Sequence, residues 1–244
     1  MLKSVNLIDA GLIDYKTCWD LQEKLFQDTI ALKTANRNLP MAQQVVPPNY
    51  LIVCEHPSVF TLGKSGKREH LLISQSELLK HGIQYYPINR GGDITYHGPG
   101  QLVVYPIIDL DQFFTDIHKY LRLLEEAVIQ TCHDFGIQTS RYEGYTGVWM
   151  DVMKPDLARK ICAMGVRCSR WVTMHGLAFN VNVDLLPFNY IIPCGIEDKK
   201  VTSLHLEVFN QPNQILVKEK LLANIAHIFQ MKFTPIPVSN FVNA

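Results

Sequence analysis

Twelve consecutive residues in the middle of the chain carry the groups best suited to chemistry. Residues 90–101 read Arg-Gly-Gly-Asp-Ile-Thr-Tyr-His-Gly-Pro-Gly-Gln, so four glycines and a proline accompany several polar side chains. This composition argues against a regular helix or a central strand, and an ordinary turn needs only one or two glycines. We therefore expect a loop whose backbone approaches a ligand closely, held between a candidate strand at 83–88 and a buried strand at 102–108.

Cys194 is the cysteine whose sequence context best suits a reactive thiol. It follows a proline and precedes a glycine, which is typical of an exposed turn, although a cysteine that merely fills the turn is an equal alternative. The other five cysteines lie in apolar or alternating segments, where this residue usually serves as a small buried hydrophobe. A reactive thiol needs a neighbouring cation or polar donor to ionise. Spacing leaves five candidate partners open: His97, His175, Lys160, Lys199 and Lys200.

Composition and charge exclude several classes of function. The 244 residues are 47% hydrophobic, and 23 basic side chains balance 23 acidic ones, which argues against a nucleic-acid-binding role. No secretion signal and no apolar run of membrane-spanning length is evident, so we expect a cytoplasmic protein with free thiols and no membrane contact. Cys162, Cys168 and His175 lack the spacing of a zinc site, so we expect neither a metal site nor a cofactor.

The elements that must position these groups follow from capping signals and periodicity. Apolar stripes and caps predict helices at 14–35, 74–82, 115–136 (with Thr115 as the cap) and 214–230. An apolar run predicts a strand at 50–54, and alternation over 147–183, with Lys160 beginning one strand, predicts antiparallel strands. There is no repeat or convincing linker. We expect one α+β domain spanning residues 1–244.

Several motifs, in this order along the chain, resemble those of the lipoyl(octanoyl) transferase family of lipoate biosynthesis. Its hallmark, Arg-Gly-Gly-x-x-Thr-x-His-x-Pro-Gly-Gln, matches residues 90–101 at each fixed position. Further matches within residues 11–206 are Glu55-His56-Pro57, Thr61-Leu62-Gly63, Gly147-Val148-Trp149, Lys160-Ile161, Gly165-Val166-Arg167, His175-Gly176-Leu177-Ala178-Phe179-Asn180, Pro193-Cys194-Gly195 and Val201-Thr202-Ser203-Leu204. The resemblance implies the fold of biotin and lipoate protein ligases, a mixed or antiparallel sheet flanked by helices.

The same resemblance implies a role for individual residues. The family pattern has its acyl-accepting cysteine at Cys194 and a partner lysine at Lys160. It places substrate-binding residues at Arg90, Gly91, Gly92, Asp93, Ile94, Thr95, Tyr96 and His97, at Ala163, Met164 and Gly165, and at Gly176, Leu177 and Ala178. The segment 36–48 is longer than the family needs, which bears on partner contacts more than on chemistry.

The family resemblance also implies the reaction and its partners. The thiolate of Cys194 would attack the octanoyl thioester of acyl carrier protein, and a lipoyl-domain lysine would then take the octanoyl group as an amide. A thioester is already activated, so no ATP is required. The expected acceptors are lipoyl domains of 2-oxoacid dehydrogenases and the glycine cleavage H protein. The alternatives are an ATP-dependent lipoate or biotin protein ligase, which needs no thiol nucleophile, and a non-catalytic module that binds acylated carriers.

Overall fold

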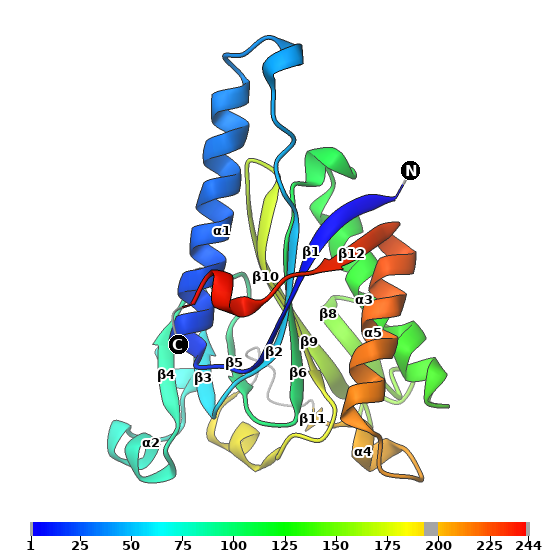
Figure 1. The fold of residues 1–244 in the computed structure, drawn as a ribbon. Coiled ribbons are helices and arrows are strands. Elements are labelled where there is room, and N and C mark those ends of the chain that lie inside the picture. The colour runs from blue at the N-terminus through cyan, green and yellow to red at the C-terminus, as the bar shows by residue number, and fades with distance from the viewer. Residues whose placement is uncertain (1, 193–199, 243–244) are drawn as a thin grey trace.

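The computed structural model describes residues 2–192 and 200–242, and within them a large mixed sheet runs through the centre of the molecule (Figure 1). Its strand order is β12-β1-β2-β6-β10-β9-β8-β7, and β11 pairs with β9. The strands are β1 (Lys3–Leu12), β2 (Tyr50–Glu55), β6 (Gln101–Ile107), β7 (Ser140–Tyr142), β8 (Tyr145–Met150), β9 (Arg159–Ser169), β10 (Val172–Asn180), β11 (Lys200–Val201) and β12 (Met231–Pro235). Strand β1 is parallel to both of its neighbours, β2 and β12. From β2 through β6, β10, β9 and β8 to β7, each strand is antiparallel to the next.

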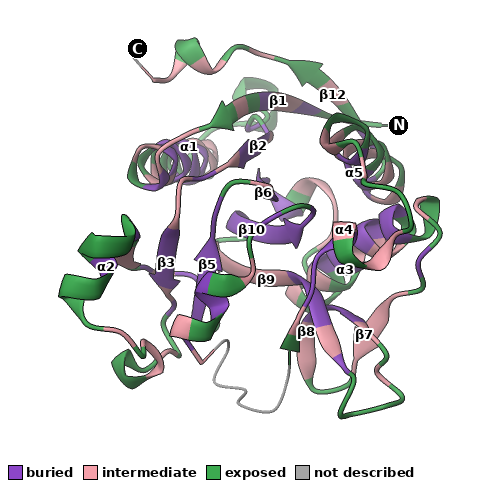
Figure 2. Cartoon of the chain, turned by 90° about the horizontal axis from the view of Figure 1, so that it is seen from below, coloured by how far each residue is buried: buried purple, intermediate pink, exposed green. Residues whose placement is uncertain are grey.

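Helices cover both faces of this sheet. The helix α1 (Tyr15–Asn36) lies against one face, and α3 (Ile117–Asp134) and α5 (Gln214–Phe229) lie together against the other (Figure 1). The two-residue period of the strands explains this division, because Leu51 and Val53 face α3 and α5 while Ile52 and Cys54 face α1. Figure 2 shows the central strands buried between the two helical layers.

A second, smaller sheet lies beside the first and carries part of the glycine-rich segment. It contains β3 (Val59–Leu62), with β4 (Gln84–Pro87) parallel on one side and β5 (Ile94–His97) antiparallel on the other. The short helices α2 (Gln75–His81) and α4 (Leu204–Glu207) complete the α-helices described. Single-turn 3₁₀ helices lie at Met41–Gln43, Arg68–His70, Leu110–Gln112, Leu186–Tyr190 and Val238–Asn240.

Capping signals predicted the helices well. The Asp14 carboxylate accepts the Thr17 N–H (2.9 Å) at the start of α1, and Ser74 forms the expected capping box with Glu77 before α2. The predicted cap of α3 was one residue too early, because the Asp116 carboxylate, and not Thr115, accepts the Lys119 N–H (2.9 Å). The α+β class with a mixed, helix-flanked sheet is confirmed.

Several strands differ from expectation, and β3, β7 and β11 are among those that were not predicted. Residues 94–97, predicted to be loop, form β5 at the edge of the small sheet, where pairing on one side suffices. The N-terminal strand β1 and the C-terminal strand β12 were not predicted, and they pair with each other although most of the chain separates them. None of the described helices is long and apolar enough to cross a membrane.

Candidate active site

The first part of the glycine-rich segment lies against β9 and against the end of β3. Its Gly91 N–H donates to the Val166 carbonyl (2.9 Å), and its Arg90 carbonyl accepts the Lys64 N–H (3.0 Å). Gly165 permits this approach, because a Cβ at that position would lie 2.7 Å from the Gly91 carbonyl oxygen. The loop and β9 therefore approach each other closely, and a glycine on each side makes this possible. The close approach of the loop backbone to a ligand stays a prediction.

A pocket opens between this loop, the β9–β10 hairpin and the start of α1. Its walls come from the loop and β5, from β9 and β10, and from two tyrosines on α1 and β6. The lining residues are Tyr15, Arg90, Gly92, Asp93, Thr95, His97, Tyr105, Ala163, Met164, Gly165, His175, Gly176, Leu177 and Ala178. The tertiary structure thus brings together most of the predicted substrate-binding residues, which lie on three separate stretches of sequence.

Three of the predicted binding residues lie elsewhere. Thr95 and His97 face the pocket. Because side chains alternate along β5, Ile94 and Tyr96 lie on the other face of this strand, where they join a separate hydrophobic cluster. Gly91 lines a neighbouring hollow instead, which also contains Lys160. The structure therefore gives Ile94 and Tyr96 a packing environment, with the Tyr96 hydroxyl 3.0 Å from that of Ser58.

Arg90 holds the loop through backbone and hydroxyl groups. One terminal nitrogen of its guanidinium donates to the Thr61 carbonyl (2.7 Å) and to the Thr61 hydroxyl (3.0 Å), and the other donates to the Gly91 carbonyl (3.0 Å). The side chain is almost fully buried. A planar group with five donors suits this bridging of two backbone segments.

A chain of hydrogen bonds connects the pocket to the strand that carries Lys160. The His97 Nδ1 donates to the Gln101 side-chain oxygen (2.7 Å), because the Gln101 amide nitrogen is committed to Asn180 (2.9 Å). The Asn180 amide donates to the Thr202 carbonyl (2.9 Å), and the Thr202 N–H donates to the Lys160 carbonyl (2.9 Å). All five residues are at least nine-tenths buried, so the network fixes their relative positions.

The histidines around the pocket are uncharged at neutral pH. Burial lowers the pKa of His97 and of His175 to about 3, and the nearby Arg90 charge adds to both shifts. Burial also lowers the pKa of His56, which lies behind the pocket, to about 4. A pocket with neutral imidazoles and with apolar walls at Met164 and Leu177 suits an uncharged aliphatic ligand.

Lys160 lies on β9 at the edge of a second hollow that is continuous with the pocket. The two share Gly92, Asp93, Met164 and Gly165. The Lys160 side chain is 8% exposed, and its ammonium lies 4.6 Å from the centre of the Trp149 ring. An aromatic face stabilises a cation in a mostly desolvated position.

Cys194 lies outside the described residues, so the structure gives no position for its thiol. The described chain on either side is anchored near the site. The Ile192 N–H donates to the His70 carbonyl (2.8 Å), and β11 pairs with β9 so that Val201 lies opposite Lys160. The carboxylate of Asp93 contacts the His70 ring (2.5 Å), so His70 connects the glycine-rich loop with the segment that leads toward Cys194.

Tyr15 and Tyr105 line the pocket but were missed by the sequence analysis. Their rings form an aromatic wall with His97, which stacks on Tyr15 at 5.8 Å between ring centres. One signal was available for Tyr105, because a tyrosine within a buried apolar strand requires a partner for its hydroxyl. That partner is His56, whose Nε2 lies 2.9 Å from the Tyr105 oxygen.

Comparison with known proteins relates the chain to lipoylation enzymes. The family model of the lipoyl protein ligase A/B catalytic domain matches residues 14–226. An octanoyltransferase of Cytophaga hutchinsonii is 59% identical over 229 residues, which cover 94% of each chain. An octanoyltransferase of Flavobacterium johnsoniae is 55% identical over 231 residues, which cover 94% of this chain and 98% of that protein.

Solved structures show the same fold at low sequence identity. A bipartite lipoate protein ligase of Thermoplasma acidophilum aligns with a TM-score of 0.69 at 16% identity, covering 96% of this chain and 87% of that one. A biotin protein ligase of Aquifex aeolicus, in complex with biotin and ATP, aligns with a TM-score of 0.52 at 15% identity, covering 92% and 70%. The expected fold of biotin and lipoate protein ligases is therefore confirmed.

Proposed function

Because the chain belongs to the family of lipoyl protein ligase A/B catalytic domains and is an octanoyltransferase, we propose that it works through a thioester on Cys194. The donor is octanoyl-acyl carrier protein and the acceptor is a lysine of a lipoyl domain. The single observation that carries this proposal is the buried pocket, with its neutral imidazoles and apolar walls, which opens onto a hollow edged by the cation of Lys160. The pocket takes the aliphatic chain, and the hollow takes the reacting carbonyl.

The first half of the reaction forms the acyl-enzyme. The Cys194 thiolate attacks the thioester carbonyl of the donor, and the carrier's thiolate leaves with the electron pair of the broken carbon–sulfur bond. The leaving thiolate takes a proton from the Lys160 ammonium, so Lys160 is neutral when the second half begins. The Lys160 ammonium favours the thiolate form of Cys194 by its charge. The support for this pairing is that Val201, seven residues beyond Cys194, lies opposite Lys160 on the adjoining strand.

The second half transfers the octanoyl group to the acceptor. The neutral amine of a lipoyl-domain lysine attacks the carbonyl of the octanoyl-cysteine, and the Cys194 sulfur leaves with its electron pair. The amine nitrogen loses a proton to Lys160 or to the departing sulfur, and a stable amide remains. The oxyanion is stabilised by backbone N–H groups near the pocket, but the N–H of Gly91 already donates to Val166.

The acceptors are the lipoyl domains of 2-oxoacid dehydrogenases and the glycine cleavage H protein. These proteins carry the lysine that the reaction modifies, and we propose that all of them meet the enzyme in the cytoplasm. The octanoyltransferase relatives and the family of the catalytic domain support this proposal. No ATP, metal or other cofactor enters the proposed steps, because the donor thioester is already activated.

An ATP-dependent ligase is the nearest alternative, and the fold does not separate the two. Lipoate and biotin ligases share the architecture at 15–16% identity. The difference must therefore come from the site. A ligase needs a place for a nucleotide and no thiol, whereas the sequence of this chain offers a cysteine in a Pro-Cys-Gly turn.

A mass measurement distinguishes the candidates. The protein is incubated with octanoyl-acyl carrier protein, with and without ATP, and its intact mass is recorded before and after a lipoyl domain is added. We expect one octanoyl adduct without ATP, lost again when the lipoyl domain becomes octanoylated. An absolute ATP requirement would indicate a ligase, and carrier binding without an adduct or transfer would indicate a binding module.

The variant Cys194→Ala tests the nucleophile, and Cys168→Ala is its control. Burial raises the pKa of the Cys54, Cys162 and Cys168 thiols and raises that of Cys132 to about 12, so these thiols stay protonated and cannot substitute. We expect no adduct and no transfer in Cys194→Ala, with unchanged thermal stability, and normal transfer in Cys168→Ala. Wild-type-like transfer by Cys194→Ala would overturn the assignment.

A further inference from the structure

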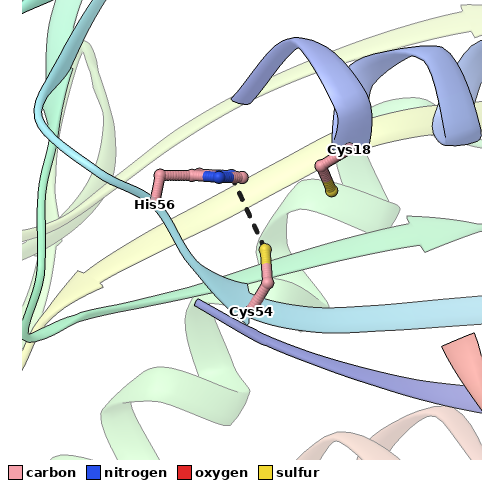
Figure 3. Close-up of side chains that lie close together, drawn as sticks. All are labelled: Cys18, Cys54 and His56. Carbon is pink, nitrogen blue, oxygen red and sulfur yellow. Dashed lines mark hydrogen bonds between the residues drawn. The ribbon is translucent and has the colours of Figure 1, made fainter. Parts of the chain in front are cut away.

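Three potential metal ligands converge behind the pocket, between α1 and β2. Cys18 lies on α1, Cys54 lies on β2, and His56 follows directly after β2. One donor atom from each lies within 4.8 Å of the other two, and all three residues are buried. Figure 3 shows both sulfur atoms and the imidazole ring directed toward a common space. The proposed reaction uses none of these side chains.

The spacing of two donors fits a tetrahedral ion. Zinc lies about 2.3 Å from a cysteine sulfur and about 2.0–2.1 Å from a histidine nitrogen. At the tetrahedral angle, these bond lengths place the sulfur and the nitrogen about 3.6 Å apart. The Cys54 Sγ lies 3.6 Å from the His56 Nε2. In the metal-free protein this distance suits an S–H···N hydrogen bond, so the two side chains already lie at the separation of a coordination edge.

His56 presents the tautomer that binds a metal. Its Nδ1 lies 2.9 Å from the Ile13 carbonyl oxygen, which can only accept, so Nδ1 carries the proton and Nε2 carries the lone pair that accepts from the Tyr105 hydroxyl. A metal-binding histidine usually donates its other N–H to a carbonyl or carboxylate in this way.

We propose that Cys18, Cys54 and His56 form a zinc-binding site. Two thiolates balance the charge of Zn²⁺, so the loaded site is neutral, which suits a fully buried position. Binding releases two thiol protons to solvent, and no electron is transferred. The Tyr105 hydroxyl, which lies 2.9 Å from the His56 Nε2, would give up this contact when the nitrogen binds the ion.

A metal here would fix the aromatic wall of the pocket. Tyr105 and Tyr15 both line the pocket, and the Tyr15 ring lies edge-on to His56 with 5.1 Å between ring centres. The ion would tie α1 to β2 across the face that carries these tyrosines. Zinc binding at this site does not depend on the octanoyl transfer proposed above, and each is measured by its own experiment.

Metal titration of purified protein tests the site. Reduced, chelator-treated protein is titrated with Zn²⁺, and bound metal is counted by elemental analysis after gel filtration. We expect one zinc per chain and a rise in the thermal midpoint. In Cys18→Ala and Cys54→Ala, zinc affinity should fall on the order of tenfold or more. Cys132→Ala, which removes a buried cysteine of the other face, should bind zinc normally, as should Cys194→Ala, whose thiol could otherwise hold zinc independently.

Cobalt gives a second measurement that requires no variant to fold. Co²⁺ in the same site should show the absorption of a tetrahedral ion together with charge-transfer bands of two thiolates. Zinc should displace it at one equivalent. Less than a tenth of an equivalent of zinc on the wild-type protein, or a cobalt spectrum without thiolate bands, would overturn the proposal. Unchanged zinc binding in both Cys18→Ala and Cys54→Ala would do the same.

Discussion

Individual side chains around the pocket are tuned by burial more than by direct ion pairing. His97 has its Nδ1 bonded to Gln101, and its Nε2 lies 3.5 Å from the Thr61 hydroxyl, so the ring is oriented without a carboxylate partner. Removal from water disfavours the charged imidazolium, which accounts for most of the lowered pKa of His97 and His175. The same property makes these residues sensitive reporters of pH.

Stability should therefore fall in mild acid. Above pH 6.5, His97 is neutral in both the folded and the unfolded chain. As pH falls from 6.5 toward the folded pKa of about 3, His97 becomes protonated in the unfolded chain but stays neutral in the folded chain. The free energy of unfolding therefore decreases. One such histidine costs about 2 kcal/mol between pH 7 and pH 5. His56 and His175 act in the same direction.

Urea unfolding at pH 7 and pH 5 measures this contribution. In His97→Gln, the loss of stability between the two pH values should shrink by about 2 kcal/mol, because one titrating group is gone. His118→Gln, at an exposed position, serves as the control and should leave the loss unchanged. An identical loss in wild type and in His97→Gln would contradict the buried neutral state.

Lys160 should act on the reactivity of Cys194. The variant Lys160→Met keeps most of the side-chain length against Trp149 and removes the charge. We expect alkylation of Cys194 at pH 7 to slow on the order of tenfold, because a nearby cation favours the thiolate. Rates are followed by mass spectrometry across pH, with the exposed Lys154→Met as control. An unchanged alkylation profile would remove Lys160 as the thiolate's partner.

At the scale of elements, glycines allow the strands and the loop to approach closely. At Gly176 on β10, a Cβ would lie 2.0 Å from the Val104 carbonyl oxygen on β6. At Gly165 on β9, it would lie 2.7 Å from the Gly91 carbonyl oxygen. Both glycines were expected to bind substrate, and both line the pocket. Their backbone packing gives each a structural reason to be glycine as well.

Gly92 offers a cleaner test of the loop than either of these. Its φ of +86° favours glycine, but a Cβ there would meet only the Arg90 guanidinium, at 3.4 Å. Gly92→Val should cost about 1–2 kcal/mol from the backbone conformation and lower kcat/KM at least tenfold, because the loop wall of the pocket is displaced.

The matched control for this variant is Gly136→Val. Gly136 has a φ of +77° with no atom within 4 Å of its Cβ, and it lies just beyond α3. It should show a comparable drop in thermal midpoint with nearly normal kcat/KM. If Gly92→Val retained full activity at the same loss of stability, the loop would be a structural turn only.

At the scale of the molecule, a balanced net charge leaves docking to local patches. Lys64, Lys67 and Arg68 are exposed on the segment that follows β3. This segment is bonded to the glycine-rich loop, with the Lys64 N–H donating to the Arg90 carbonyl and the Ser65 N–H to the Gly92 carbonyl. Three basic side chains beside the pocket suit an acidic partner, and acyl carrier proteins are typically acidic.

Charge reversal of this patch should separate docking from chemistry. In a variant with Lys64→Glu, Lys67→Glu and Arg68→Glu, we expect KM for octanoyl-acyl carrier protein to rise on the order of tenfold and to lose its salt dependence. Acylation of Cys194 by a small soluble octanoyl thioester should stay normal. Reversal of Lys3, Lys220 and Lys232, exposed on β1, α5 and β12, is the control. Equal losses with both donors would mean that the patch shapes the pocket instead.

The sequence by itself determined the features that depend on neighbouring residues. The apolar stripe of the first helix, the capping box at Ser74 and the alternation around Lys160 are signals within a few residues, and the structure confirms the elements they predict. The order of motifs also indicated the family, which the comparisons confirm. The roles of Cys194 and Lys160 remain predictions.

Only the tertiary structure decided which distant side chains meet. The pairing of β1 with β12, the aromatic wall of Tyr15 and Tyr105, and the group of Cys18, Cys54 and His56 join residues from separate elements. Cys162, Cys168 and His175 are close in sequence, whereas Cys18 is 36 residues from Cys54. Cys18 and Cys54 meet because α1 packs across β2 on one face of the sheet. Local spacing does not encode which face a helix covers, since that depends on how all the layers pack together.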